Sequence, residues 1–142
     1  MNTSTPDILV VGGAGYIGSH VVKALRDAGR QPAVFDNLST GLRENLFPEI
    51  PFIHGDLLIP EQVRTAMRGI RSVIHLAALK AAGDSMLEPE RYAHHNLNGT
   101  VNLLHAAGTA GVRHFVFSSS AAVYGEPQYL PCLLYTSDAA DE

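Results

Sequence analysis

The sequence of 142 residues contains a single cysteine, Cys132, and no tryptophan. One cysteine excludes a disulfide within the chain and favours the reducing cytosol. No apolar run approaches the roughly 20 residues that cross a bilayer. Residues 1–7 lack a basic segment before an apolar core, which argues against a secretory signal. We therefore predict a cytoplasmic protein without membrane contact.

The chain also lacks a large excess of charge of one sign. Ten Lys and Arg face fourteen Asp and Glu, for a net charge of -4, and no run of five like charges occurs. This balance disfavours binding to nucleic acid or to an anionic membrane. The seven histidines lack the i,i+4 pairing of a helical metal site, and the adjacent His94 and His95 project in different directions. We therefore predict no metal site.

Short apolar runs alternate with segments of helical period. Strands are predicted at residues 8–11, 33–35, 51–54, 72–76 and 114–117. Helices are predicted after Gly15, from Pro60 and over about residues 98–110, because apolar side chains recur there every three or four positions. The expected buried faces comprise Ile17, Val21, Leu25 and Ala28 in the first helix, Val63, Ala66 and Met67 in the second, and Val101, Leu104 and Ala107 in the third.

Strands separated by helices predict a single α/β domain with a doubly wound parallel sheet of the Rossmann type. Parallel neighbours need crossover connections, and helices must cover both faces of such a sheet.

The segment between the first strand and the first helix has three glycines with the spacing Gly-x-x-Gly-x-x-Gly. Gly12 allows a tight turn, Gly15 lets backbone amides approach a pyrophosphate, and Gly18 allows close packing of helix on strand. The helix N-terminus offers free N–H groups to phosphates. The context of strand, turn and helix favours a dinucleotide site over an ordinary glycine-rich turn.

Acidic residues follow the second and third predicted strands. Asp36 stands where a carboxylate can accept hydrogen bonds from both ribose hydroxyls, and it would repel a 2′-phosphate, which favours NAD over NADP. The alternative is a turn-forming residue before Asn37. Asp56 could reach the adenine end of the cofactor, or it could cap a helix or form a turn.

These motifs together resemble the extended short-chain dehydrogenase/reductase family, and most closely its UDP-glucose 4-epimerase branch. The resemblance covers essentially all of residues 8–125. It rests on residues 12–20, 36–41, 55–57, 75–81, 96–100 and 117–125. The stretch Asp-Asn-Leu-Ser-Thr-Gly at 36–41, and Leu79-Lys80-Ala81 with residues 83–85, are more particular to the 4-epimerases.

The resemblance implies NAD-dependent epimerisation at C4 of a UDP-hexose, interconverting UDP-glucose and UDP-galactose. The implied NAD-binding residues are Gly12, Gly15, Tyr16, Ile17, Gly18, Asp36, Asn37, Asp56, Leu57, Leu76, Ala77, Lys80, Asn96 and Ser118. The implied substrate-binding residues are Lys80, Ser120 and Tyr124, and Ser120 would assist catalysis at the 4′-hydroxyl.

Some of these roles have plain alternatives. Lys80 could be a solvated loop lysine, Asn96 could cap the helix that begins near Asn98, and a serine cluster at a strand end is often only a turn. The family's homodimers use two helices per subunit, one of which matches residues 91–110.

The chain departs from the family pattern in two respects. Ala122 stands where many relatives have threonine. The family's Tyr-x-x-x-Lys motif, whose lysine lowers the pKa of the catalytic tyrosine, is missing, because Leu133 and Ala139 lie four residues beyond Tyr129 and Tyr135. We therefore expect residues 1–131 to be an incomplete NAD-binding domain, truncated at its C-terminus and inactive as it stands.

The final residues, 132–142, match a translation of a transposase-derived sequencing adaptor at all eleven positions. We expect this tail to be non-native, and the alternative is an ordinary acidic C-terminus. Two further functions stay open: another epimerase or dehydratase acting on nucleotide sugars, and a non-catalytic dinucleotide-binding module.

Overall fold

The computed structural model describes residues 5–120 and 123. Five parallel strands form one sheet in the order β3-β2-β1-β4-β5. They are β1 (Ile8–Val11), β2 (Pro32–Asp36), β3 (Phe52–His54), β4 (Ser72–His75) and β5 (His114–Phe117). The structure thus confirms the predicted parallel sheet, with each strand within one residue of its predicted bounds.

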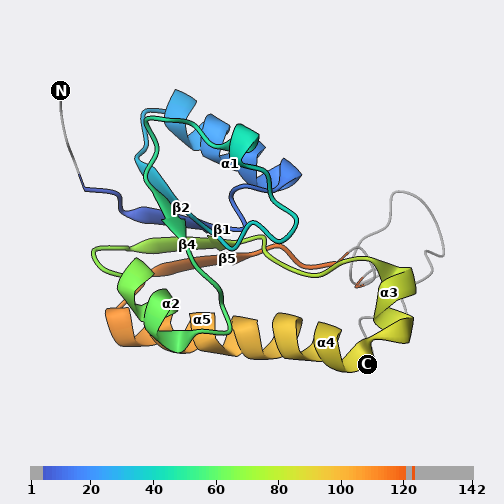
Figure 1. Cartoon of the computed structure of the whole chain (residues 1–142). Coiled ribbons are helices and arrows are strands. Elements are labelled where there is room, and N and C mark those ends of the chain that lie inside the picture. The colour runs from blue at the N-terminus through green and yellow to red at the C-terminus, as the bar shows by residue number, and fades with distance from the viewer. Residues whose placement is uncertain (1–4, 121–122, 124–142) are drawn as a thin grey trace, which may run out of the picture.

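Helices cover both faces of the sheet, as a doubly wound fold requires (Figure 1). α1 lies on one face, and α2 and α5 lie together on the other. The helices are α1 (Tyr16–Asp27), α2 (Pro60–Ala66), α3 (Ala82–Leu87), α4 (Pro89–Ala93) and α5 (Gly99–Ala110), with a 3₁₀ turn η1 (Arg43–Asn45) and a π-helical turn η2 (His94–Asn98). The sequence pattern did not predict η1, α3 or α4, and the helix that the resemblance implied over residues 91–110 comprises the end of α4, η2 and α5.

The alternation of side chains along β1 divides the core between the two faces. Leu9 and Val11 pack with α2 and α5, whereas Ile8 and Val10 pack with Val22 of α1. All four strand residues are at most 4% exposed. A strand buried on both faces is apolar throughout, which is why its short run could be assigned from sequence.

The helical faces were predicted less well. In α1 the most buried apolar residue is Val22, at 1% exposure, while Ile17 is 55% exposed. In α5 the buried face is formed by Gly99, Leu103, Ala106 and Ala107. The prediction that Val101 and Leu104 are buried was wrong, because they are 61% and 49% exposed. In α2, Val63, Ala66 and Met67 are buried as predicted.

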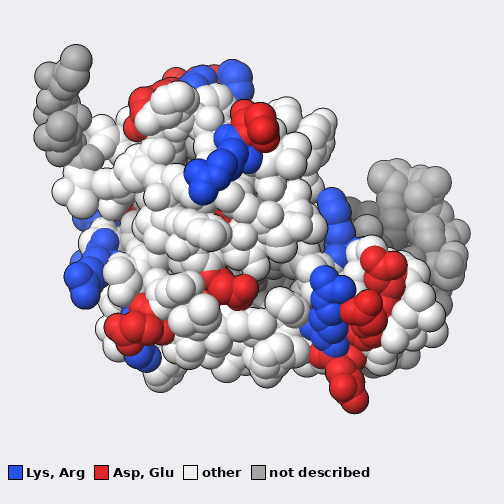
Figure 2. Space-filling view, viewed as in Figure 1, with Lys and Arg blue, Asp and Glu red and all other residues white. Residues whose placement is uncertain are grey.

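The surface carries charges of both signs, with basic and acidic side chains interspersed on the face shown in Figure 2. Within residues 5–120 and 123, no helix has the length and hydropathy needed to cross a membrane.

Candidate functional site

The centre of the candidate site is the region where the carboxyl ends of β1 and β4 lie side by side. The chain passes from β1 to β2 on one side and then crosses to β4 on the other, so the strand order reverses at β1. Ligands of open α/β sheets bind at such a point. Gly12, directly after β1, has φ +81, and a Cβ there would lie 2.8 Å from the Ala77 amide nitrogen. Only glycine allows these two segments to approach so closely.

The glycine turn is held tightly by backbone contacts. The Gly12 N–H donates to the Phe35 carbonyl at 2.8 Å, and the Gly15 N–H donates to the Gly12 carbonyl at 3.2 Å. A Cβ on Gly18 would lie 2.1 Å from the Gly12 oxygen. These contacts confirm the structural part of the prediction, a tight turn at Gly12 and close packing at Gly18.

The first turn of α1 is open to an anionic ligand. Its N-cap residue, Gly15, has no side chain to cap the helix, and no acidic residue lies in the first turn. Tyr16 and Ile17 are 77% and 55% exposed. The first N–H groups of a helix lack intrahelical partners and carry the positive end of its dipole. This end of α1 therefore fits the pyrophosphate of a dinucleotide.

Asp36 is buried at the end of β2, with 8% exposure. Its Oδ2 accepts the Ala14 N–H at 3.0 Å, and its Oδ1 accepts the Leu38 N–H at 2.8 Å. Leu38 itself has φ 57, in the left-handed region, where leucine is strained. Asp36 is thus a turn-forming residue. Since a carboxylate has about four acceptor positions, it also retains capacity for ribose hydroxyls.

Asp56 and Asn37 join the ends of β2 and β3. The Asn37 amide donates to Asp56 Oδ2 at 3.1 Å, and Asp56 Oδ1 accepts the Leu58 N–H at 2.8 Å. The second bond is a turn contact. The alternative of a helix cap was wrong, because the N-cap of α2 is Ile59. Leu57 lies half-buried beside the pair.

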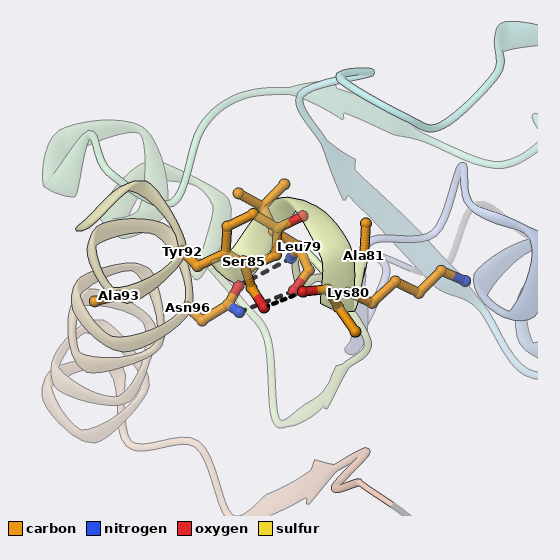
Figure 3. Close-up of a pocket in the computed structure, with 8 residues that line it drawn as sticks. Leu79, Lys80, Ala81, Ser85, Tyr92, Ala93 and Asn96 are labelled. Carbon is orange, nitrogen blue, oxygen red and sulfur yellow. Dashed lines mark hydrogen bonds between the residues drawn. The ribbon is translucent and has the colours of Figure 1, made fainter. Parts of the chain in front are cut away.

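The loop after β4 carries three of the predicted site residues. The Leu76 N–H donates to the Val11 carbonyl at 2.9 Å, which holds the loop beside the glycine turn. Leu76 and Ala77 are half-buried, and Lys80 is exposed. Lys80 points away from Asn96 in Figure 3, toward the side where the blue amino-terminal ribbon lies. Its ammonium group is therefore accessible to a ligand.

Asn96 fixes this loop through two hydrogen bonds. Its Oδ1 accepts the Leu79 N–H, and its Nδ2 donates to the Leu79 carbonyl, both at 2.9 Å (Figure 3). Asn96 lies in η2, whose π-helical register interrupts the α-helix, a feature frequent at functional sites. The capping role was wrong, since no side chain caps α5. A shallow pocket of about 360 Å³ adjoins this pair.

The serine cluster follows β5, next to the loop after β4. The Ser118 N–H donates to the His75 carbonyl at 3.1 Å, so Ser118 stays in register with β4. Ser118 and Ser120 are exposed. Both therefore lie at the same edge of the sheet as Lys80. Tyr124, Ala122 and residues 132–142 lie outside the described residues.

His75, the last residue of β4, is a buried titratable group that precedes the loop carrying Lys80. It is 1% exposed and contacts Thr100 Oγ1 through Nε2 at 3.0 Å. Its Nδ1 is buried without a hydrogen-bond partner among the described residues. Burial lowers the pKa of His75 to about 4. The ring is therefore neutral at pH 7. A histidine within an apolar strand was the available signal.

No group of three or more His, Cys, Asp or Glu residues that could hold a metal ion occurs in residues 5–120 and 123.

Comparison with known proteins identifies the family. Residues 8–140 match the model of the NAD dependent epimerase/dehydratase family. The chain is 45% identical to a UDP-glucose 4-epimerase of Streptomyces lividans over 126 residues, which cover 87% of this chain and 38% of that protein. It is 42% identical to the mouse (Mus musculus) UDP-glucose 4-epimerase over 139 residues, 87% of this chain and 40% of the relative.

Solved structures agree with this result. The chain matches the UDP-glucose 4-epimerase from Brucella ovis in complex with NAD, with a TM-score of 0.83 and 40% identity over 89% of this chain and 39% of that one. It matches the Thermotoga maritima enzyme with UDP-glucose at a TM-score of 0.80 and 39% identity, over 87% and 41% of the two chains. The chain thus spans about two fifths of these relatives, 38% to 41%. It belongs to the NAD-dependent epimerase/dehydratase family.

Proposed function

We propose that the parent protein of this chain catalyses NAD-dependent epimerisation at C4 of a UDP-hexose, interconverting UDP-glucose and UDP-galactose. The observation that carries the proposal is the convergence of the glycine turn, Asp36 and the Lys80 loop at one edge of the sheet. The relatives named above are UDP-glucose 4-epimerases, and one was solved with NAD.

The cofactor would bind across the carboxyl ends of the strands. The first-turn amides at Tyr16 and Ile17 would hold the pyrophosphate, and Asp36 would accept the hydroxyls of the adenine ribose. A carboxylate in this position repels a 2′-phosphate, so NAD is preferred over NADP. The remaining proposed NAD-binding residues are Gly12, Gly15, Gly18, Asn37, Asp56, Leu57, Leu76, Ala77, Lys80, Asn96 and Ser118.

Asn96 would act mainly through the loop that it holds. Both the oxygen and the nitrogen of the Asn96 side-chain amide form hydrogen bonds with the Leu79 backbone. We therefore propose that Asn96 orients the adjacent Lys80. Lys80 would then place its ammonium group near the nicotinamide ribose and the sugar.

At the reacting carbon, Ser120 would hydrogen-bond the 4′-hydroxyl and assist its proton transfer. Tyr124, which is not among the described residues, would lie beside the sugar. When bound, NAD supplies the acceptor and donor of hydride for C4 of the sugar. The protein contributes positioning of that carbon and control of the hydroxyl proton.

The deciding experiment is an assay of the parent for interconversion of UDP-glucose and UDP-galactose. Bound NAD without turnover would contradict the proposal and would favour another nucleotide-sugar reaction of the family. For the 142-residue chain alone we expect no turnover, because neither Tyr129 nor Tyr135 is followed four residues later by lysine. Turnover by the purified chain would refute that expectation.

We further propose that the parent is a cytoplasmic homodimer. Leu97, Val101 and Leu104 are 65%, 61% and 49% exposed, and their spacing places them along one side of the η2–α5 segment. A second subunit would cover this apolar stripe. Analytical ultracentrifugation of the parent would test it, with Val101→Glu expected to give monomers.

The domain assignment is likewise a proposal, with residues 1–131 as native sequence and 132–142 as an adaptor-derived tail. Codons in the source DNA that differ from the adaptor sequence would refute it.

A further inference from the structure

Ala14, in the middle of the glycine turn, is held on both sides by one segment that runs from the last residue of β2 through η1. The peptide that precedes it is fixed by its N–H, which donates to Asp36 Oδ2 at 3.0 Å. The peptide that follows it is fixed by its carbonyl, which accepts the Leu42 N–H at 3.1 Å and the Asn45 side-chain amide at 2.8 Å. Residues 36–45 therefore form a clamp on the turn.

The clamp requires close contact, and the chain is built to allow it. A Cβ on Gly41 would lie 2.8 Å from the Ala14 Cβ and 3.0 Å from Asp36 Oδ1. Glycine at this position lets the returning chain reach Ala14. The 3₁₀ turn η1 then places Asn45 beside Leu42, whose carbonyl accepts the Asn45 N–H at 3.1 Å.

The orientation of the second peptide matters for a bound pyrophosphate. A peptide group is planar, so holding the Ala14 carbonyl also fixes the direction of the Gly15 N–H on the same peptide. Gly15 is the N-cap of α1. Its peptide therefore determines where the first free amides of the helix begin.

We propose that Asn45 is a positioning residue of the dinucleotide site, which keeps the pyrophosphate-binding turn in place by holding the Ala14 carbonyl. Asn45 bonds the carbonyl of Ala14, whereas Asp36 bonds its N–H, and Asn45 does not itself have to touch the ligand. The inference rests on the proposed NAD-binding function, and it predicts a selective effect: a ligand with a pyrophosphate depends on Asn45, whereas its adenosine half does not.

The test titrates ADP and adenosine separately into the 142-residue chain and follows amide resonances by NMR. The variants are Asn45→Ala and, as the matched control, Glu44→Ala at the exposed neighbouring position. We expect Asn45→Ala to bind ADP about tenfold more weakly, as loss of one hydrogen bond allows, with adenosine affinity changed less than twofold. Glu44→Ala should leave both affinities unchanged.

If Asn45→Ala weakened the binding of ADP and of adenosine equally, Asn45 would have a general structural role and the proposal would be overturned. Unchanged binding of both ligands would also overturn it. Asn45→Ser, whose hydroxyl is too short to replace the amide, serves if Asn45→Ala does not fold. Should the wild-type chain bind neither ligand, residues 1–142 alone do not form the NAD site, the assay of the parent tests the proposed function separately, and hydrogen exchange decides the inference. The Leu42 amide should then exchange about tenfold faster in Asn45→Ala than in Glu44→Ala, and equal rates would refute it.

Discussion

His75 makes the stability of the fold depend on pH. The ring is 1% exposed, and its burial lowers the pKa to about 4 from an ordinary value of 6.5. The folded chain therefore favours the neutral ring, while the unfolded chain takes up a proton below pH 6.5. Stability is highest above pH 6.5 and falls as the pH drops toward 4, because the unfolded state then binds more protons.

The size of the effect follows from the two pKa values. A difference of 2.5 units between 6.5 and about 4 corresponds to a total loss of about 3 kcal/mol once the pH is below 4, at about 1.4 kcal/mol per unit. As the pH is lowered from 7.5 to 5, the free energy of unfolding already decreases by about 2 kcal/mol, which is most of this loss. For a domain of ordinary stability, that is a large share of the free energy of unfolding.

Urea unfolding of the wild type and of His75→Gln at pH 7.5 and 5 measures this loss. Glutamine can keep a hydrogen bond to Thr100 but does not titrate, so the wild type should lose about 2 kcal/mol more than the variant. His105→Gln, at an exposed position of α5, is the control and should follow the wild type. Parallel pH profiles for the wild type and His75→Gln, or an NMR pKa for His75 near 6.5, would refute the reasoning.

Further substitutions test particular contacts. Gly18→Ala places a Cβ 2.1 Å from the Gly12 oxygen and should cost about 2 kcal/mol or more; an unchanged thermal melting point would show that the turn can relax. Gly108→Ala meets nothing within 4 Å in α5 and should stabilise by about 0.5–1 kcal/mol, whereas Gly111→Ala, at φ +74, should destabilise by about 1 kcal/mol. Urea unfolding measures both changes in the free energy of unfolding, and changes of the same sign in the two variants would contradict this account. Asn96→Ala removes two hydrogen bonds to Leu79 and should lower stability by about 1–2 kcal/mol, with Asn98→Ala at an exposed position as control; an unchanged Leu79 amide exchange rate would count against the contact.

The sheet could be predicted from sequence because its signals are local. Runs such as residues 8–11 are apolar throughout, and they need no knowledge of their neighbours to be recognised as strands buried on both faces. The same holds for the glycine turn, where Gly12 and Gly18 each meet backbone that would clash with a Cβ. The turn at Asp36 could also be predicted, since Asp36 directly follows the strand predicted at residues 33–35.

Other features could not be predicted because they depend on partners distant in the chain. Asn96 bonds Leu79 across 17 positions, and Asn45 bonds Ala14 across 31. An asparagine side chain has no periodicity, so its partner cannot be identified from spacing. The buried faces of α1 and α5 were predicted incorrectly for a related reason, since Ile17 and Val101 are apolar but exposed. The spacing of apolar residues identifies a helix, but it does not show which of these residues are buried.

The exposed apolar residue Ile17 and the buried charged residue Asp36 have complementary explanations in this fold. Ile17 lies in the first turn of α1, where helix amides must be accessible if a phosphate is to bind, so burial of its side chain against the sheet would close the site. Asp36 is buried, yet both carboxylate oxygens accept backbone N–H groups, which offsets the cost of removing a charge from water. Ile17 and Asp36 both lie beside the glycine turn, whereas other exposed apolar side chains, such as Val101 of α5 and Phe117 of β5, lie elsewhere. An accessible helix N-terminus and a buried, hydrogen-bonded carboxylate thus meet at the carboxyl end of β1, which is the arrangement expected of a dinucleotide site.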